Sequence, residues 1–106
     1  MKTSLFTALL LLSSTQLFAA DIANGKALST QCSVCHGKNG IATDPEAPNL
    51  AGQGAYYLEK AMVDYKKGLR QDRRMSIIAQ ALSLDDIKDL AAWYAAFEIV
   101  VTEPEL

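Results

Sequence analysis

The chain has 106 residues, with 10 basic and 12 acidic side chains, two cysteines and one histidine. This length leads us to expect one small domain, and the sequence shows no internal repeat or low-complexity segment. The formal net charge of −2 argues against nucleic acid as a partner, because nucleic-acid-binding domains are usually basic.

The N-terminus has the pattern of a secretory signal peptide. Lys2 precedes an apolar run over residues 5–12, and small residues follow at Ala19 and Ala20. We therefore expect residues 1–20 to be removed on export, with cleavage after Ala19 or Ala20. The apolar run is short for a membrane span, and we expect no stable span in the mature protein. The residue three positions before either cut is large, so a retained N-terminal anchor is the alternative.

Residues 21–31 are predicted to form a helix. Asp21 is a suitable N-cap, and Ile22, Gly25 and Leu28 fall near one face. Because glycine lowers helix stability, we expect Gly25 to allow a close crossing with another helix. The alternative is that this glycine loosens a frayed first turn.

The next residues, Cys32-Ser33-Val34-Cys35-His36, have the spacing of a site for covalent haem attachment. Two residues between the cysteines, on one turn of helix, present both sulfurs to the two vinyl groups of one porphyrin. The histidine continues the turn, which places its ring nitrogen beneath the iron. We therefore predict one haem c, bonded through Cys32 and Cys35 and ligated by His36.

Three other interpretations fit this motif less well. Two cysteines in an exported protein would normally pair as a disulfide. A redox-active cysteine pair has the same spacing, but it usually accompanies a strand–helix–strand pattern, and we predict no strands. A closed zinc site needs four ligands, and the chain offers only Cys32, Cys35 and His36 of the usual soft ones.

Residues 37–54 are rich in glycine, proline and polar residues and are predicted to form a loop. A loop directly after His36 must line one side of the haem and orient the imidazole ring. An iron-bound imidazole normally donates its other N–H group to a carbonyl or carboxylate, and Pro48 offers a carbonyl without a competing N–H. The alternative is that Pro45 and Pro48 are ordinary turn residues.

Three helical segments follow the loop. We expect helices over residues 55–67, 75–82 and 84–97, and a C-terminal tail over 99–106. The first ends at Gly68, a typical C-cap residue, and Ser83 with Asp86 makes a capping-box start for the last. The apolar stripe of the first consists of Tyr57, Leu58, Ala61, Met62 and Tyr65. The apolar face of the last consists of Ile87, Leu90, Ala91, Tyr94 and Phe97.

The iron needs a second axial ligand, and two methionines are candidates. Met75 follows a loop and precedes a short helix, so the backbone there can adapt to reach the far face of the haem. Met62 lies on the apolar face of a helix, where methionine usually fills space in a core. We expect Met75 to be the ligand, and the alternatives are Met62 or no protein ligand in the sixth position.

Taken along the chain, these motifs resemble the class I c-type cytochromes, and most closely the small bacterial cytochrome c553 and c4-type domains. The matching segments are Cys32-x-x-Cys35-His36-Gly37, residues 48–53, Gly68-x-Arg70, Met75 and residues 90–94. The resemblance implies an all-α fold of about four helices around one covalent haem, with the cytochrome domain over residues 21–98. It implies thioether bonds at both cysteines, with His36 and Met75 as the axial ligands.

The same resemblance implies two contacts around the haem. The carbonyl of Pro48 would accept the N–H group of His36. Gly25, together with Trp93 or Tyr94, would form the crossing of the first and last helices.

The resemblance also implies one-electron transfer between redox proteins, and export of such a haem protein suggests the bacterial periplasm. Ligation by histidine and methionine would raise the reduction potential and leave no open position for a substrate, so we do not expect an enzyme. One alternative is a haem enzyme or sensor with an open sixth position, if Met75 does not ligate iron. The other is a cytochrome subunit docked permanently in a larger oxidoreductase.

A basic run leads into Met75. It contains Lys66, Lys67, Arg70, Arg73 and Arg74, against one acid, Asp72. We predict that part of this run docks acidic redox proteins near an exposed haem edge. The alternatives are an ordinary solvated link between helices and an arginine bound to a haem propionate. The tail from Ile99 is longer and more apolar than the resemblance leads us to expect, and it is a second candidate for docking.

Overall fold

The computed structural model describes residues 19–106, and this part of the chain is helical, without a strand. Its elements are α1 (Ile22–Leu28), a 3₁₀ helix η1 (Ser29–Gln31), α2 (Ser33–His36), α3 (Ala55–Lys67), α4 (Met75–Gln80) and α5 (Leu84–Ala95). The predicted all-α fold is confirmed. The predicted signal peptide, residues 1–20, lies outside the described residues except for its last two. Within residues 19–106, no helix has the length and apolar character needed to cross a bilayer.

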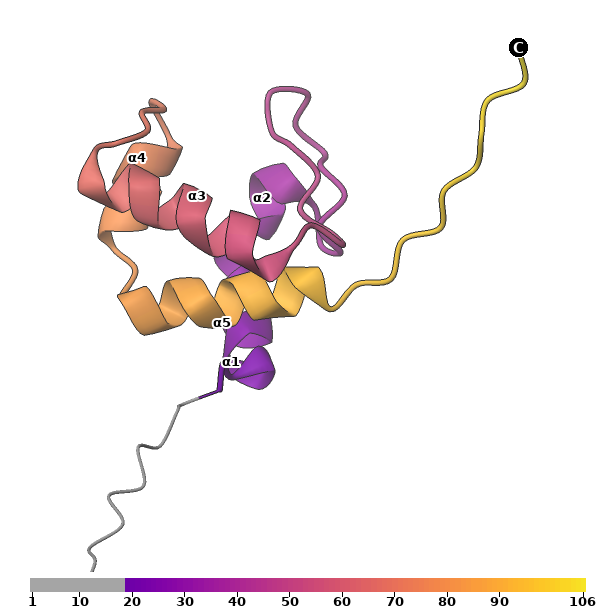
Figure 1. The fold of residues 1–106 in the computed structure, drawn as a ribbon. Coiled ribbons are helices and arrows are strands. Elements are labelled where there is room, and N and C mark those ends of the chain that lie inside the picture. Colours follow the sequence, from indigo (N-terminus) through magenta and orange to yellow (C-terminus); the bar gives the residue numbers. More distant parts are fainter. Residues whose placement is uncertain (1–18) are drawn as a thin grey trace, which may run out of the picture.

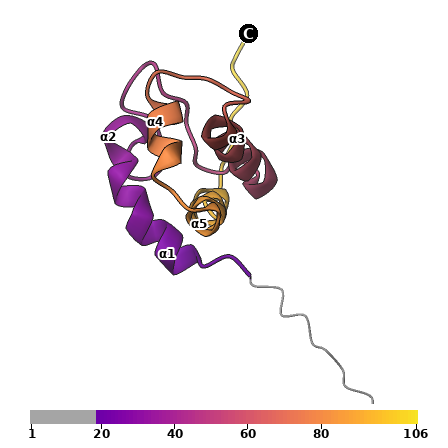
Figure 2. The ribbon, with the colours of Figure 1, turned by 90° about the vertical axis from the view of Figure 1, so that its left-hand side faces the viewer.

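The last helix, α5, is the element around which the others are arranged. In Figure 1, α3 lies along one side of α5, and α1 crosses α5 on the opposite side. Figure 2 looks nearly along α5 and shows α1, α3 and α4 placed around it. The first and last helices of the described chain are therefore in direct contact.

Gly25 lies at the crossing of α1 and α5, as its position in the sequence predicts. A Cβ atom at this position would lie 2.1 Å from the carbonyl oxygen of Asp89 and 2.9 Å from the Cβ of Trp93. The Asp89 carboxylate also accepts from the backbone N–H of Asp21 at 2.7 Å and from the Asn24 side chain at 2.8 Å. The crossing is thus fixed by close backbone contact and by polar contacts at its edge.

The predicted helix over residues 21–31 divides at Leu28, after which the chain tightens into η1. Asp21 caps α1 as expected, by accepting from the backbone N–H of Asn24 at 3.0 Å. The division has a local cause, because the Ser29 hydroxyl donates to the carbonyl of Lys26 at 2.7 Å and competes with the helix for that acceptor.

The later helices begin and end close to the predicted positions. The α3 helix spans the predicted residues, and its C-cap Gly68 has φ +74°, the left-handed conformation that favours glycine. The capping box of α5 is present, with the Ser83 side chain and the Asp86 side chain each accepting from the other's backbone. The α5 helix ends at Ala95, two residues before the predicted end. The backbone N–H of Gly52 in the loop donates to the carbonyl of Tyr94, at 2.9 Å.

The tail after α5 is extended and leaves the body of the molecule, as Figure 1 shows. Ile99 is half exposed, and its side chain lies against Gly52. Val100 and Val101 are 92% and 83% exposed. The docking role of this tail stays a prediction.

The hydrophobic core between α3 and α5 is small for a chain of this length. Its buried members are Leu58, Leu82, Ile87, Leu90, Ala91 and Tyr94. Ile87 is the largest side chain that is fully buried within the described residues. A core this small needs a further source of stability, and a group bound between the helices could supply it.

Candidate functional site

A cavity of about 360 Å³ lies between α2, α3, α4 and α5. The complete predicted stripe of α3 lines it, as do four residues of the predicted apolar face of α5. These residues are Tyr57, Leu58, Ala61, Met62, Tyr65, Ile87, Leu90, Ala91 and Tyr94. A cavity lined mainly by apolar side chains indicates a binding site for a large apolar group.

The Cys-x-x-Cys-His motif forms one wall of this cavity. Cys32, Cys35 and His36 all line it, and the last two belong to the single turn of α2. Gly37 follows with φ +76°, and a Cβ there would lie 1.7 Å from the carbonyl oxygen of Ile41. The glycine therefore lets the loop fold back against α2. Both cysteines are free thiols, so the disulfide alternative is not what the structure shows.

The imidazole of His36 is buried, and its Nδ1 atom lies 2.8 Å from the carbonyl oxygen of Pro48. Since a carbonyl can only accept, Nδ1 must donate its hydrogen, which leaves Nε2 with a lone pair for a metal. The contact that the sequence predicts between these residues is therefore present. Its role toward a bound haem stays a prediction.

Both candidate methionines line the cavity. Met75 is the first residue of α4, and its backbone N–H donates to the carboxylate of Asp72 at 2.9 Å. Met62 lies in the middle of α3 and packs against the core. The cavity alone therefore does not decide which methionine binds the iron. Met75 stays the predicted ligand, because the backbone at the junction of loop and helix can adapt to bring its sulfur to the haem.

Comparison with protein families gives the class of this chain. The family model of cytochrome c matches residues 22–95, from the start of α1 to the end of α5. The chain belongs to the cytochrome c family.

The relatives of this cytochrome c are bacterial. Cytochrome c4 of Pseudomonas aeruginosa is 41% identical over 83 residues, which cover 78% of this chain and 41% of that protein. Cytochrome c-554(548) of Halomonas halodenitrificans is also 41% identical over 83 residues, which cover 76% of this chain and 100% of that protein. The crystal structure of reduced cytochrome c4 from Pseudomonas stutzeri has a TM-score of 0.70 at 32% identity, covering 76% of this chain and 47% of that chain. The chain thus spans less than half of these two cytochrome c4 proteins.

A cytochrome c carries covalently attached haem, and the one attachment motif gives this chain one haem c. The residues of the cavity fit this cofactor. Two thiols and an imidazole stand on one wall, two thioether sulfurs stand among the other lining residues, and the surfaces between them are mainly apolar. Within residues 19–106 there is no cluster of three or more cysteine, histidine or acidic residues placed to hold a metal ion.

The environment of Cys32 also favours attachment over thiol exchange. Burial raises the pKa of the Cys32 thiol, whereas a thiol that exchanges disulfides needs a lowered pKa. Burial likewise raises the pKa of Tyr94, whose hydroxyl has no hydrogen-bond partner in the structure. The Cys32 thiol and the Ser29 hydroxyl are among its polar neighbours, but neither has the geometry of a hydrogen bond. An unpaired hydroxyl at the cavity wall is a polar group that a bound cofactor can satisfy.

The structure shows which of the two aromatic residues, Trp93 or Tyr94, lies at the helix crossing. Trp93 packs at the crossing of α1 and α5, with its ring 5.0 Å from Phe97 and the Lys26 ammonium 5.7 Å from the ring centroid. Tyr94 lines the cavity, and Trp93 does not. Trp93 therefore belongs to the helix crossing, and Tyr94 belongs to the haem site.

Most of the predicted basic run is engaged within the molecule. Lys66 donates to the carbonyl of Gln80 at 3.1 Å. The Arg70 guanidinium lies 4.8 Å from the ring centroid of Tyr65, and the neighbouring Tyr57 hydroxyl raises the pKa of Arg70. The side chains of Arg73 and Arg74 pair with acidic residues of the loop over residues 37–54. These acidic partners lie far from the arginines in the sequence, and no local pattern predicts them.

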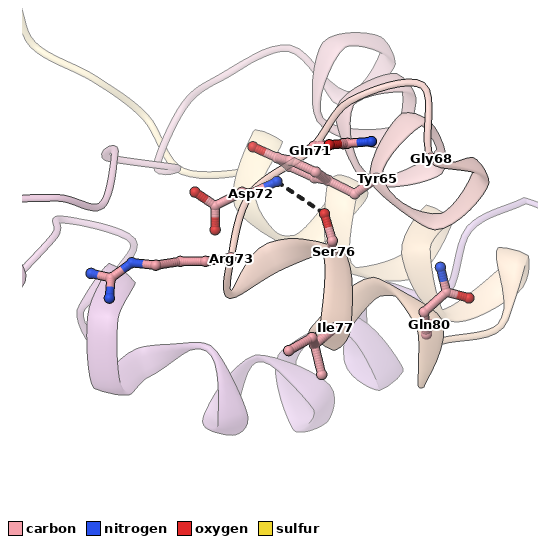
Figure 3. A pocket seen from close by; sticks show the side chains of 8 residues that line it. All are labelled: Tyr65, Gly68, Gln71, Asp72, Arg73, Ser76, Ile77 and Gln80. Atoms are coloured by element: carbon pink, nitrogen blue, oxygen red, sulfur yellow. Dashed lines mark hydrogen bonds between the residues drawn. The ribbon is translucent and has the colours of Figure 1, made fainter.

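A second hollow of about 550 Å³ opens on the outer side of the turn between α3 and α4 (Figure 3). Its residues are Tyr65, Gly68, Gln71, Asp72, Arg73, Ser76, Ile77 and Gln80. The dashed line in Figure 3 marks the backbone N–H of Asp72 donating to the Ser76 hydroxyl, 2.9 Å away. This hollow contains none of the cysteines, histidine or methionines of the predicted site, so it is not the haem cavity.

Proposed function

We propose that this cytochrome carries single electrons between redox proteins of the bacterial periplasm. Its functional unit is the cytochrome domain over residues 21–98, and residues 1–20 are the signal for export. The observation that carries the proposal is the cavity itself, in which the Cys-x-x-Cys-His wall and Met75 border one mainly apolar space.

Each residue of the site has a separate task in this proposal. Cys32 and Cys35 would hold the haem covalently, and His36 and Met75 would ligate its iron. Haem c supplies an iron that cycles between the ferrous and ferric states. The carbonyl of Pro48 fixes the tautomer and orientation of His36, and a thioether ligand together with apolar walls favours ferrous iron and a high reduction potential.

The proposal excludes catalysis at the iron. With His36 and Met75 both bound, no coordination position remains for a substrate, so the protein transfers electrons without transforming a bound molecule. Its partners are other redox proteins, either encountered transiently or as members of a larger oxidoreductase. A sedimentation or gel-filtration measurement on the purified holoprotein separates a free carrier from a permanently docked subunit.

Covalent attachment is the direct test of the site. The haem of the wild-type protein should stay with the polypeptide after denaturation and extraction with acidic organic solvent. Replacing Cys32 and Cys35 together with alanine should release it. Haem that extracts freely from the wild-type protein would contradict the proposal.

A further inference from the structure

Arg74 directly precedes Met75 in the sequence, and both residues line the haem cavity. Its Nη1 atom lies 2.6 Å from Oδ2 of Asp44, and its Nη2 atom lies 3.3 Å from Oε2 of Glu46. Both acids belong to the loop that follows α2, about 30 residues earlier in the chain. The side chains of Arg74 and Asp44 are only 34% and 26% exposed. An ion pair at this depth is screened less by solvent than an ordinary surface pair.

Asp44 is itself fixed to the haem-attachment motif. The backbone N–H groups of Thr43 and Asp44 both donate to the carbonyl of Cys35, at 3.1 and 3.2 Å. The other carboxylate oxygen of Asp44 accepts from the backbone N–H of Glu46 at 2.8 Å. Asp44 therefore has little freedom to follow Arg74 if the arginine moves.

The backbone on the Met75 side is held in a similar way. One carboxylate oxygen of Asp72 accepts from the N–H groups of both Arg74 and Met75, at 2.8 and 2.9 Å. Asp72 in turn donates its own N–H to the hydroxyl of Ser76, which closes the first turn of α4 (Figure 3). A restraint on the Arg74 side chain thus acts on a short, rigid segment that contains Met75.

We propose that the pair of Arg74 and Asp44 is a clasp that ties the Met75 segment to the haem-attachment motif and thereby limits how readily the Met75 sulfur leaves the iron. Arg74 and Asp44 are positioning residues in this proposal, since they act through Met75 and do not bind the iron. The inference rests on the proposed ligation of the iron by Met75. It concerns how fast the bond between the Met75 sulfur and the iron opens. Knowing that methionine is the ligand does not determine this rate.

Arg73 provides a matched control at the neighbouring position. Its guanidinium also binds Glu46, at 2.7 Å, but the two side chains are 74% and 62% exposed. Exposed pairs of this kind contribute little to stability. Removing this arginine changes the net charge by the same amount and leaves the Asp44 contact in place.

The test follows displacement of the sixth ligand in the ferric holoprotein by added imidazole, recorded by absorbance in stopped flow. The variants are Arg74→Gln, Asp44→Asn, their combination and the control Arg73→Gln. Arg74→Gln and Asp44→Asn should each accelerate displacement by about tenfold, the size of effect expected for losing one partly buried charge-assisted hydrogen bond. The double variant should be no faster than the more affected single variant, and Arg73→Gln should match wild type. Without imidazole, all variants should keep the wild-type spectrum.

Two reference measurements make the result decisive. Met75→Ala should bind imidazole without a displacement step, and if its kinetics equal those of wild type, the ligand assignment and the clasp both fail. If Met75→Ala differs but Asp44→Asn exchanges at the wild-type rate, the ligand assignment stands and the clasp is wrong. An effect of Arg74→Gln without one of Asp44→Asn would assign the arginine to a haem carboxylate instead. Arg74→Lys keeps the charge without the guanidinium fork, should give an intermediate rate, and serves if Arg74→Gln does not fold.

Discussion

The hydrogen bond between His36 and Pro48 limits the chemistry available to the imidazole. Because Nδ1 donates to a carbonyl, only Nε2 can bind a metal, and the ring is held by a backbone atom that does not titrate. For Met75, the proposed second ligand, the hydrogen bond that the structure shows is made by the backbone N–H. Met75 depends on its backbone position at the start of α4 and on the residues that hold this position.

Two substitutions distinguish the methionines. Met75→Ala should lower the reduction potential and open the iron to external ligands, because the sulfur ligand is lost. Met62→Ala should keep the spectrum and potential and reduce the free energy of unfolding by about 2 kcal/mol, the low end of the range for methionine to alanine, because Met62 is only partly buried. Redox titration with thermal unfolding of both variants is the measurement. A potential that moves only in Met62→Ala would reverse the assignment.

At the crossing of α1 and α5, a single glycine, Gly25, allows the two helices to approach closely. At Gly25 the carbonyl of Asp89 occupies the place where any other residue would carry its Cβ. The polar contacts of Asp89 with Asp21 and Asn24 then fix the rotation of α1 on α5. Helix packing this close is sensitive to one methyl group.

Gly25→Ala should therefore destabilise the protein, although alanine is the better helix former. The added methyl group meets backbone rather than a flexible side chain, and overpacking of this kind costs about 1–3 kcal/mol. Gly54→Ala is the control, because a Cβ at Gly54 has no atom within 4 Å and its φ of −61° suits alanine. Chemical denaturation measures both. Equal stability of the two variants would show that the helices are not held at the distance described here.

The capping box of α5 makes the stability of that helix depend on pH. The backbone N–H of Ser83 donates to the Asp86 carboxylate at 3.1 Å, and this bond holds the pKa of Asp86 below its usual value. A lowered folded-state pKa stabilises the protein above the unfolded pKa of about 3.9, and this contribution is lost as the pH falls through the folded pKa. Asp86→Asn should therefore melt below wild type at pH 7, with a difference that shrinks in acid. Asp85→Asn, in the same turn but outside the capping box, is the control.

The sequence predicts the elements of this fold well and the space between them less well. Residues 55–67 and the Ser83–Asp86 box follow from local signals, since periodicity and capping act within a few residues. The division of the first helix at Ser29 could not be predicted, because serine also occurs within continuous helices and its residue type alone does not show where its hydroxyl will bond. The apolar stripe of α3 lines the cavity, and periodicity alone cannot tell a stripe that packs against other side chains from one that lines a binding site. The partners of Arg70 and Arg74 depend on how the folded chain brings distant segments together.

At the level of the whole molecule, most basic side chains of the run over residues 66–74 already have partners within the protein. Fewer of them are therefore free to form the predicted docking surface. Arg70, Arg73 and Arg74 each have partners, and Lys66 is bound to α4. Lys67, on the last turn of α3, is exposed and is the member of the basic run best placed to meet a partner.

Lys67→Glu should slow second-order electron transfer with an acidic redox protein at low ionic strength, without moving the potential. Such steering is screened over about 8–10 Å at physiological salt, so the difference from wild type should vanish as salt is added. Lys26→Glu makes the same change in net charge beside Trp93, at the helix crossing, and should leave the rate unchanged. Stopped-flow rates across a salt series give the comparison. Equal slowing by both variants would mean that net charge, and not this surface, governs the encounter.

The contact between α1 and α5 also has a consequence in time. It joins residues 65 and 68 positions apart, so a chain made from its N-terminus displays both cysteines well before the helix that completes the cavity exists. At about 5–20 residues per second, the interval is roughly 3–13 seconds. During this interval the segment that carries both cysteines lacks the helix against which α1 packs in the folded protein. The two cysteines therefore belong to the part of the chain that is made first, and α5, which completes the cavity around them, is made last.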